Sequence, residues 1–194
     1  LRLKNVLGTR EGFEQPPVPP QTNERIGGPN LEVIEGGPDL DITDHVDEDS
    51  DAAKALAGMK RAEPSFNVTD FLQGARGAYE MIVMGYETGE LADIQPFLSE
   101  EIYESFVDGV AAREDQGLTI EADFIGVREL KLMDATFNED TNEAELSIRY
   151  VAELTSVVRD QGGDIVEGSP TEVKRQKDTW SFARTMGADD PNWL

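Results

Sequence analysis

The sequence predicts an α+β domain in which helices come first and a strongly curved antiparallel sheet, wrapped around a long helix, follows. Near Leu118 the spacing of the apolar residues changes from 3.6 to 2, which is the change expected from helix to strand. Thirteen of the fourteen aromatic residues lie in residues 66–194, and only Phe13 precedes them. We therefore expect one folded domain over 66–194 and a flexible arm over 1–65.

The arm is rich in proline, glycine and acidic side chains, and seven of the ten prolines of the chain lie in it. With Phe13 as its single aromatic residue, such a segment buries too little apolar surface to offset its conformational entropy. The pattern permits a short helix over 51–62, which Pro64 separates from the domain. The acidic run 47–51 lacks the ligand spacing of a calcium-binding loop, so it predicts a solvated linker and no metal site.

The beginning of the arm has the composition of a membrane-proximal segment. Apolar residues alternate there with three basic ones, and the candidate membrane-proximal residues are Arg2, Lys4 and Arg10. Basic residues collect at the cytoplasmic border of membrane helices. We therefore expect an anchor upstream of this chain at a bacterial inner membrane, with the domain facing the cytoplasm.

Two amphipathic helices are predicted at the start of the domain. The first begins at a cap on Asn67 or Thr69 and runs to Thr88, and Gly89 ends it. Its apolar stripe comprises Phe71, Leu72, Ala75, Ala78, Tyr79, Ile82, Val83 and Tyr86. A short turn around 91–97 leads to the second helix, capped by Ser99 and ended by Gly117, whose apolar stripe comprises Ile102, Tyr103, Phe106, Val107 and Val110.

Alternating residues predict three long antiparallel strands. The first begins at Leu118 and contains a bulge near Gly126, and the second, 144–154, is strictly alternating. In the last strand, Val173 has the opposite parity to Trp180 and Phe182, which predicts a bulge or bend between them. Such a sheet curls around a helix into a cone and leaves an apolar pocket at its mouth, for which the candidate residues are Tyr79, Val83, Tyr86, Phe97, Tyr103, Phe106, Trp180 and Phe182.

The charge favours some classes of partner and excludes others. Seventeen basic and forty acidic side chains give a net charge of −23, of which residues 66–194 carry −17. This charge repels nucleic acid and anionic lipid headgroups and attracts basic protein segments. Binding to such segments should weaken as salt is raised.

Catalysis is not indicated. The chain has no cysteine, and its one histidine, His45, lies in the predicted arm, where it cannot act as a preorganised base. Asp178, Tyr86 and Arg184 are the polar groups closest to the predicted pocket mouth, but no nucleophile–base pair or phosphate-binding loop accompanies them. The sequence therefore predicts a binding protein with no catalytic residues and no cofactor.

Four segments of the domain together resemble a known family. They are the run Phe71–Ile82, the glycine-containing turn and strand Gly162–Gly168, the strand Asp178–Arg184 and the closing segment Asp190–Leu194. In this order they resemble the C-terminal domain of the mitochondrial inner-membrane import subunit Tim-forty-four, in its bacterial form. The resemblance covers nearly all of residues 66–194.

The resemblance implies a cone fold similar to cystatin and to nuclear transport factor two. It also implies a membrane-tethered adaptor that binds proteins during protein translocation or membrane-protein biogenesis. The partners expected are a translocase, an insertase, a chaperone or basic nascent segments. The alternative function is a lipid- or small-ligand-binding domain that uses the apolar pocket of the cone, and the oligomeric state stays open.

Overall fold

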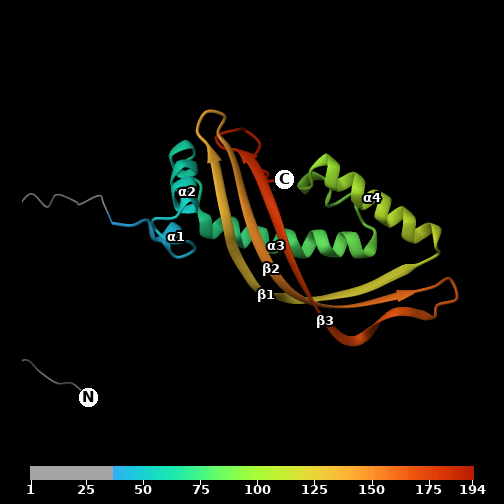
Figure 1. Cartoon of the computed structure of the whole chain (residues 1–194). Helices are drawn as coiled ribbons and strands as arrows, with labels where there is room; N and C mark the ends of the chain where they lie inside the picture. The colour runs from blue at the N-terminus through green and yellow to red at the C-terminus, as the bar shows by residue number, and fades with distance from the viewer. Residues whose placement is uncertain (1–36) are drawn as a thin grey trace, which may run out of the picture. The chain divides into compact units, whose positions relative to one another are not determined.

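The structure, a computed structural model, describes residues 37–194. The prolines at the start of the arm and the candidate membrane-proximal residues Arg2, Lys4 and Arg10 lie outside this range. The described chain forms four helices, one short 3-10 turn and three strands (Figure 1). In order these are α1 (Leu40–Thr43), α2 (Asp51–Ala62), α3 (Val68–Thr88), η1 (Gln95–Phe97), α4 (Glu100–Asp115), β1 (Thr119–Asn138), β2 (Glu143–Arg159) and β3 (Ile165–Thr185).

The long helix α3 begins and ends where local capping requires it. The Asn67 side chain accepts a hydrogen bond from the backbone N–H of Asp70 at 2.8 Å, and Gly89 ends the helix in a left-handed conformation (φ 81°). One face of the helix is buried, and its buried residues are Val68, Leu72, Ala75, Tyr79, Ile82, Val83 and Gly85. Both predicted caps of this helix are thereby confirmed.

The sheet is antiparallel, with strand order β1-β2-β3, and it curves around α3 (Figure 1). Along β2 every second residue from Ala144 to Leu154 is buried in the main core, as the alternation predicted. Register shifts next to Gly126 and Val127 and before Asp134 bend β1, since each bulge increases the local twist and curvature. The predicted α+β fold with a curved sheet around a long helix is confirmed.

The irregularity in β3 lies a few residues before the predicted position. Pairing with β2 is continuous from Lys174 to Thr185, so there is no bulge between Val173 and Trp180. The unpaired stretch is 170–173, which includes Val173 itself. It begins at Pro170, which has no N–H to donate to the sheet.

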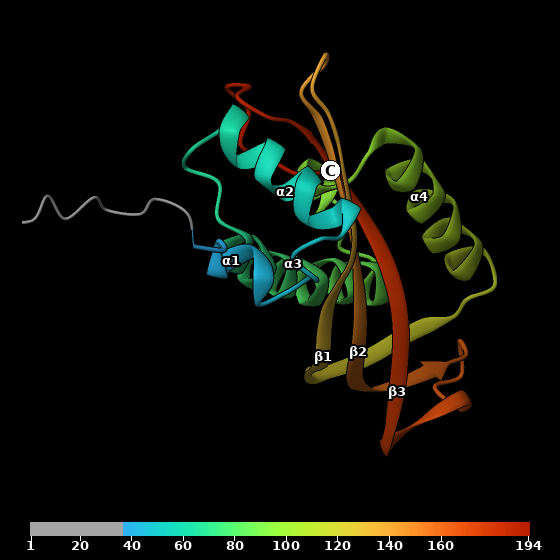
Figure 2. The same ribbon diagram turned by 60° about the vertical axis from the view of Figure 1, so that its left-hand side comes forward.

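Residues that the sequence assigned to the arm are part of the fold from residue 40 onward. Helix α2 covers the range given for the short helix, and Leu56 and Met59 on its inner face are fully buried in the main core. Ala52 and Ala53 complete that face at helical spacing. Figure 2 shows α1 and α2 on one side of the domain and α4 on the other.

Helix α1 is tied to the start of α3 through one side chain. The Asp41 carboxylate accepts hydrogen bonds from the backbone N–H groups of Val68 and Thr69 at 2.8 and 3.0 Å, and from the Thr69 hydroxyl at 2.8 Å. Lys60 of α2 lies 2.7 Å from the same carboxylate. Burial of Asp41 raises its pKa, but the hydrogen bonds from Lys60 and the backbone outweigh this and hold the pKa well below its usual range.

Candidate functional site

An apolar cavity of about 360 Å³ lies between α4 and β3. Its walls come from both elements and from the turn before α4, and its lining residues are Ile82, Phe97, Leu98, Ser99, Ile102, Phe106, Thr179, Trp180, Ser181, Phe182 and Leu194. The aromatic side chains reach it because Trp180 and Phe182 alternate onto the concave face of β3. The cavity is of the size and composition of a ligand- or peptide-binding pocket. We call it the α4 cavity.

Helix α4, which forms one wall of the cavity, is held to the rest of the domain by few side chains. Val110 is its only buried residue, whereas Ile102 is 46% exposed and Val107 is 40% exposed. Arg113 adds one polar contact, because its guanidinium donates to the Tyr86 carbonyl at 2.6 Å. Most other polar residues of the helix are acidic, namely Glu100, Glu101, Glu104, Asp108, Glu114 and Asp115. Helix α4 thus faces the cavity with apolar side chains and faces water with acidic ones, because Glu101, Glu104 and Asp108 are all exposed.

A second apolar cavity, of about 380 Å³, lies next to the first. Phe97 and Phe182 line both cavities, and Phe66, Phe71 and Trp193 are further aromatic residues of the second. The ring of Trp193 packs on Phe66 and Phe71 with centroid distances of 5.8 and 4.9 Å. The closing segment of the chain is thus a wall of this second cavity.

Two contacts hold the closing segment in place. Leu194 exchanges two backbone hydrogen bonds with Ala183, at 2.9 and 3.1 Å, so the segment pairs with the edge of β3. The Glu63 carboxylate accepts from the Gly187 N–H at 2.8 Å and forms an ion pair with Arg184 at 3.0 Å. The hydrogen bond from Gly187 and the neighbouring Arg184 guanidinium lower the pKa of Glu63. The sequence alone predicted no structural contact for this segment. An aromatic residue so close to the end of the chain, Trp193, was the signal that the segment packs on the domain.

The structure brings four of the predicted pocket residues together at the α4 cavity, namely Phe97, Phe106, Trp180 and Phe182. The other four lie elsewhere. Tyr79 and Val83 are buried in the main core, where Tyr79 stacks on Tyr150 at 4.2 Å. Tyr86 and Tyr103 belong to a smaller apolar cluster that also contains the cavity-lining Phe106, which the Tyr86 ring contacts at a centroid distance of 4.6 Å, but neither tyrosine lines the cavity.

The polar groups weighed for catalysis are occupied by structural contacts. Asp178 accepts hydrogen bonds from the Tyr79 hydroxyl at 2.5 Å and from the Gln176 amide at 2.8 Å. Burial, together with the bond to Asp178, raises the pKa of Tyr79 far above its usual range, so its hydroxyl stays protonated. His45 lies in hydrogen-bonding distance of the Thr69 hydroxyl, 3.2 Å away.

Neither a metal site nor a membrane-spanning helix is found in the part of the chain that the structure describes. Within 37–194, no three acidic or histidine side chains are grouped so that they could hold a metal ion. None of the helices in this range is both long enough and apolar enough to cross a bilayer. The features left for a candidate site in this range are the apolar cavities and the charged residues of the surface.

Comparisons with known proteins identify the family. A family model described as "Tim44-like domain" matches residues 52–194, a range that includes most of α2. Among solved structures, the crystal structure of the intermembrane space region of the chloroplast protein ARC6 is similar with a TM-score of 0.29 and 12% identity, over 54% of this chain and 80% of that one. No curated protein matches the chain.

The family match confirms the resemblance found in the sequence and extends it toward the N-terminus. Tim44-like domains are membrane-associated domains of the protein translocation machinery, where they interact with proteins and have no catalytic role. The match covers both cavities and the closing segment. This chain belongs to the family of Tim44-like domains.

Proposed function

We propose that the protein is an adaptor at the bacterial inner membrane that binds basic amphipathic protein segments during translocation or membrane-protein biogenesis. In this proposal the domain faces the cytoplasm, and the basic residues Arg2, Lys4 and Arg10 lie next to the membrane. The partners are a translocase, an insertase, a chaperone or nascent chains. The observation that carries the proposal is the α4 cavity, one wall of which is a helix with an acidic exposed side.

An amphipathic helix with a basic face needs two things from its receptor. It needs an apolar groove for one face and negative charge for the other. The α4 cavity offers Phe106 and Trp180 for the apolar face. The exposed side of α4 offers Glu101, Glu104 and Asp108 for the basic face.

The partly exposed apolar residues of α4 add to this surface. Ile102 and Val107 each leave a large fraction of their side chains in water. Covering such side chains is favourable by about 25 cal/mol per Å² of apolar surface removed from water. Because few side chains hold α4 to the core, the helix can adjust its position to admit a partner of varied sequence.

The test is the affinity of the full chain for a fluorescently labelled basic amphipathic helix of about 20 residues. We expect the Kd to rise about tenfold between about 20 and about 150 mM salt, because the charges lie near the surface and are screened. A variant with Glu101→Gln, Glu104→Gln and Asp108→Asn should bind weakly even at low salt.

The matched control removes the same charge from another place. Asp164→Asn, Glu167→Gln and Glu172→Gln change three exposed acidic residues of the β2–β3 hairpin, and the peptide should still bind with at most a small loss. Binding that is insensitive to salt, or that is lost equally in both variants, would contradict the proposal.

A lipid or small apolar ligand is the second candidate, and the two neighbouring cavities favour it. They share Phe97 and Phe182, and both volumes fall within the range of ligand pockets. Native mass spectrometry of the purified protein would show a bound mass of constant size if this function holds. A bound ligand that the basic peptide does not displace would favour this candidate over the adaptor.

A further inference from the structure

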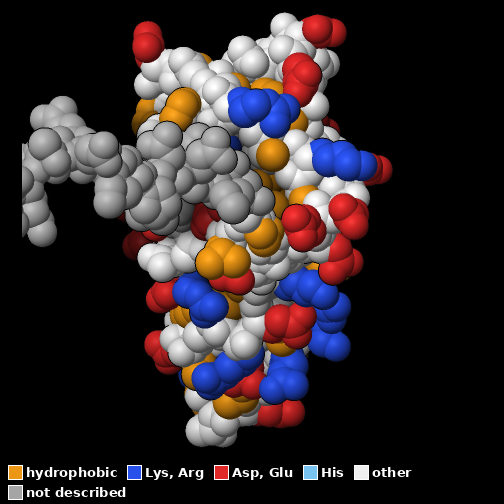
Figure 3. All heavy atoms as spheres, turned by 90° about the vertical axis from the view of Figure 1, so that its left-hand side faces the viewer, with side chains coloured by type: hydrophobic (Ala, Val, Ile, Leu, Met, Phe, Trp, Pro, Cys, Tyr) orange, Lys and Arg blue, Asp and Glu red, His pale blue; other side chains and the backbone are white. Residues whose placement is uncertain are grey.

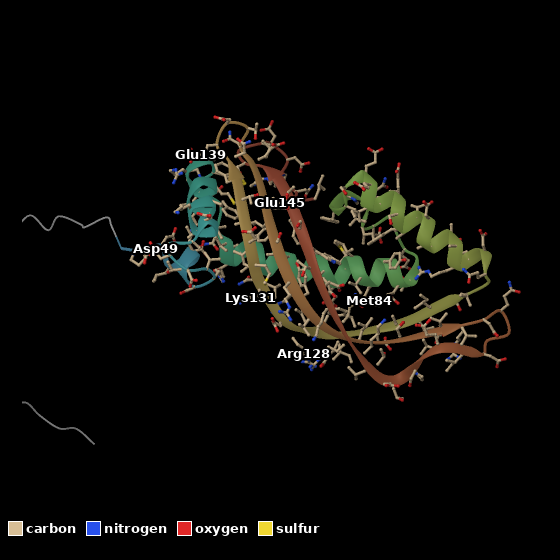
Figure 4. All side chains as sticks on the ribbon, viewed as in Figure 1. Asp49, Met84, Arg128, Lys131, Glu139 and Glu145 are labelled. Carbon is tan, nitrogen blue, oxygen red and sulfur yellow. The ribbon has the colours of Figure 1, made fainter. Side chains whose placement is uncertain are left out.

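The outer, convex face of the sheet carries a concentration of basic residues that contrasts with the acidity of the chain. Five basic side chains lie there around the bend of the strands. We call them the convex patch, and they are Arg128, Lys131, Arg149, Arg175 and Lys177. Figure 3 shows Lys and Arg side chains gathering over the lower half of the domain, and Figure 4 shows Arg128 and Lys131 at the bend.

The strand register makes these residues neighbours. Lys131 of β1 is paired with Arg149 of β2, so two cations lie directly opposite each other. In the adjacent positions Lys177 of β3 pairs with Val151, and Arg175 pairs with Glu153. Directly opposite side chains on one face of a sheet have Cβ atoms about 5 Å apart, and like charges there destabilise the pairing.

The patch keeps a positive charge after its ion pairs are counted. Glu153 accepts from Arg128 at 2.6 Å and from Arg175 at 2.8 Å, so one carboxylate serves two guanidiniums. Glu129 is the other acidic residue in these rows. Within the described residues, Lys131, Arg149 and Lys177 form no ion pair. The fold therefore keeps cations together at a cost in stability, which is expected of a binding surface.

The shape of the patch indicates a flat partner. None of its five residues lines either apolar cavity, and of the five only Lys131 borders a shallow polar hollow beside the loop between α1 and α2. An extended or helical peptide is normally received by a groove or a free strand edge. A convex face without a groove instead meets a plane at its apex, so the basic residues gathered there approach the plane most closely. Charges farther from the plane than the Debye length of about 8 Å contribute little.

The residues around the patch favour a lipid surface over nucleic acid. Met133 is 48% exposed and Ile125 is 45% exposed, and both lie at the bulges of β1 that border the patch. Aliphatic side chains beside basic ones suit the boundary between headgroups and acyl chains. Single-stranded nucleic acid is bound instead by aromatic rings that stack on bases. All aromatic residues of the three strands are paired on the opposite, concave face, namely Phe124, Phe137, Tyr150, Trp180 and Phe182.

We propose that the convex patch binds the anionic headgroups of a lipid bilayer. The net charge of the chain predicts repulsion from such a surface, and the patch is a local exception at the apex of the sheet. Docking there orients the domain so that α4, on the other side of α3, points away from the membrane (Figure 1). The inference goes beyond the adaptor function and does not depend on the α4 cavity.

The test is co-sedimentation of the full chain with vesicles. One set contains only phosphatidylcholine, and the other contains in addition about 40% phosphatidylglycerol, at low and at physiological salt. We expect binding to the anionic vesicles alone, and weaker binding as salt is raised. A variant with Lys131→Glu, Arg149→Glu and Lys177→Glu should lose about a hundredfold in affinity, because each basic residue near an anionic surface contributes about 1 kcal/mol.

The matched control reverses three surface basic residues away from the patch, Lys54→Glu, Arg61→Glu and Arg159→Glu, which gives the same change in net charge. It should keep most of its vesicle binding. Circular dichroism and thermal unfolding check that both variants fold. If the patch variant does not fold, the milder Lys131→Gln with Lys177→Gln should still bind at least tenfold more weakly.

Three outcomes would overturn the inference. The first is equal binding to neutral and anionic vesicles, and the second is equal loss in the patch and control variants. The third is that the patch binds duplex DNA or an acidic peptide more tightly than anionic vesicles at the same salt. The peptide-binding test of the adaptor function can succeed or fail independently, because the vesicle assay contains no peptide.

Discussion

The two ends of α3 are held in very different ways. At its N-terminal end, α1, α2 and the closing segment surround the helix, and Asp41 and Glu63 each accept several hydrogen bonds there. At its C-terminal end, α4 approaches it through a small apolar cluster, and Val110 is the only residue of α4 that is buried. The N-terminal end of α3 is therefore closely packed on several sides, whereas its C-terminal end has few buried contacts with α4.

This difference indicates that one region of the domain provides stability and the other provides the binding surface. A well-packed region resists local opening, whereas a helix with few buried contacts opens at a low cost in free energy. Partner-binding elements are drawn from such low-stability regions. We call the main core, formed by α1, α2, α3 and the three strands, the frame, and it supplies rigidity. Helix α4 with its cavity supplies an adaptable surface. The predictions below test this contrast, from the largest expected effect to the smallest.

Truncating a side chain in the frame should have the largest effect. Leu56→Ala removes a fully buried side chain of α2 and should lower the free energy of unfolding by about 3 kcal/mol, as for other core leucines. Chemical denaturation followed by Trp fluorescence measures this value. A loss below about 1 kcal/mol would mean that α2 is not part of the core in solution.

Removing the carboxylate that joins α1 to α3 should have the next largest effect. Asp41→Ala leaves the first N–H groups of α3 without acceptors, which should cost about 2 kcal/mol. Asp44→Ala is the matched control, because the described residues show no side-chain hydrogen bond from Asp44, and it should change stability by at most about 0.5 kcal/mol. Similar losses in the two variants would argue against the capping role.

Acid should weaken the frame through the same groups. The folded-state pKa values of Asp41 and Glu63 are depressed below their unfolded values, so their stabilisation is complete above the unfolded pKa values. It is lost as the pH falls through the folded values. The free energy of unfolding should therefore decrease below about pH 5, and Asp41→Asn should show a smaller decrease. Parallel pH profiles would contradict this assignment.

Truncation in α4 should have the smallest effect on stability. Ile102→Ala removes a side chain that is nearly half exposed, so the free energy of unfolding should fall by less than about 1 kcal/mol. The same variant should bind the basic amphipathic peptide several-fold more weakly, because Ile102 lines the α4 cavity. Fluorescence anisotropy gives the Kd. A large loss of stability with unchanged affinity would reverse the roles of the two regions.

The parts of the fold that rest on local signals were predictable from the sequence. The caps of α3 at Asn67 and Gly89, the cap of α4 at Ser99 and the alternation of β2 all depend on residues close together in the chain. The predicted bulge near Gly126 is confirmed for the same reason. The order of helices and strands then followed from the change of period.

The contacts between distant segments were not predictable. Asp41 lies 27 residues before the N–H group of Val68 that it caps, and Trp193 packs on residues from the opposite end of the domain. The apolar face of α2 was overlooked because its two alanines and short length gave a weak signal. At the candidate site, Trp180 and Phe106 were chosen for their aromatic character. They line one cavity because α4 packs next to β3, and no local sequence signal shows this packing.

The convex patch shows the same limit for charge. Lys131, Arg149 and Lys177 are widely spaced in the sequence and become neighbours only through the strand register. A net charge averaged over the chain cannot reveal such a cluster, because it sums over faces that point in different directions.

Hydrogen–deuterium exchange of the full chain, with and without the basic amphipathic peptide, tests the contrast between frame and binding surface most directly. Without peptide, amides of α4 should exchange much faster than those of α2 and α3. With peptide, protection should appear in α4 and in residues 179–182 of β3, and α2 should not change. Slow exchange of α4 in the free protein, or protection confined to other elements, would contradict the account.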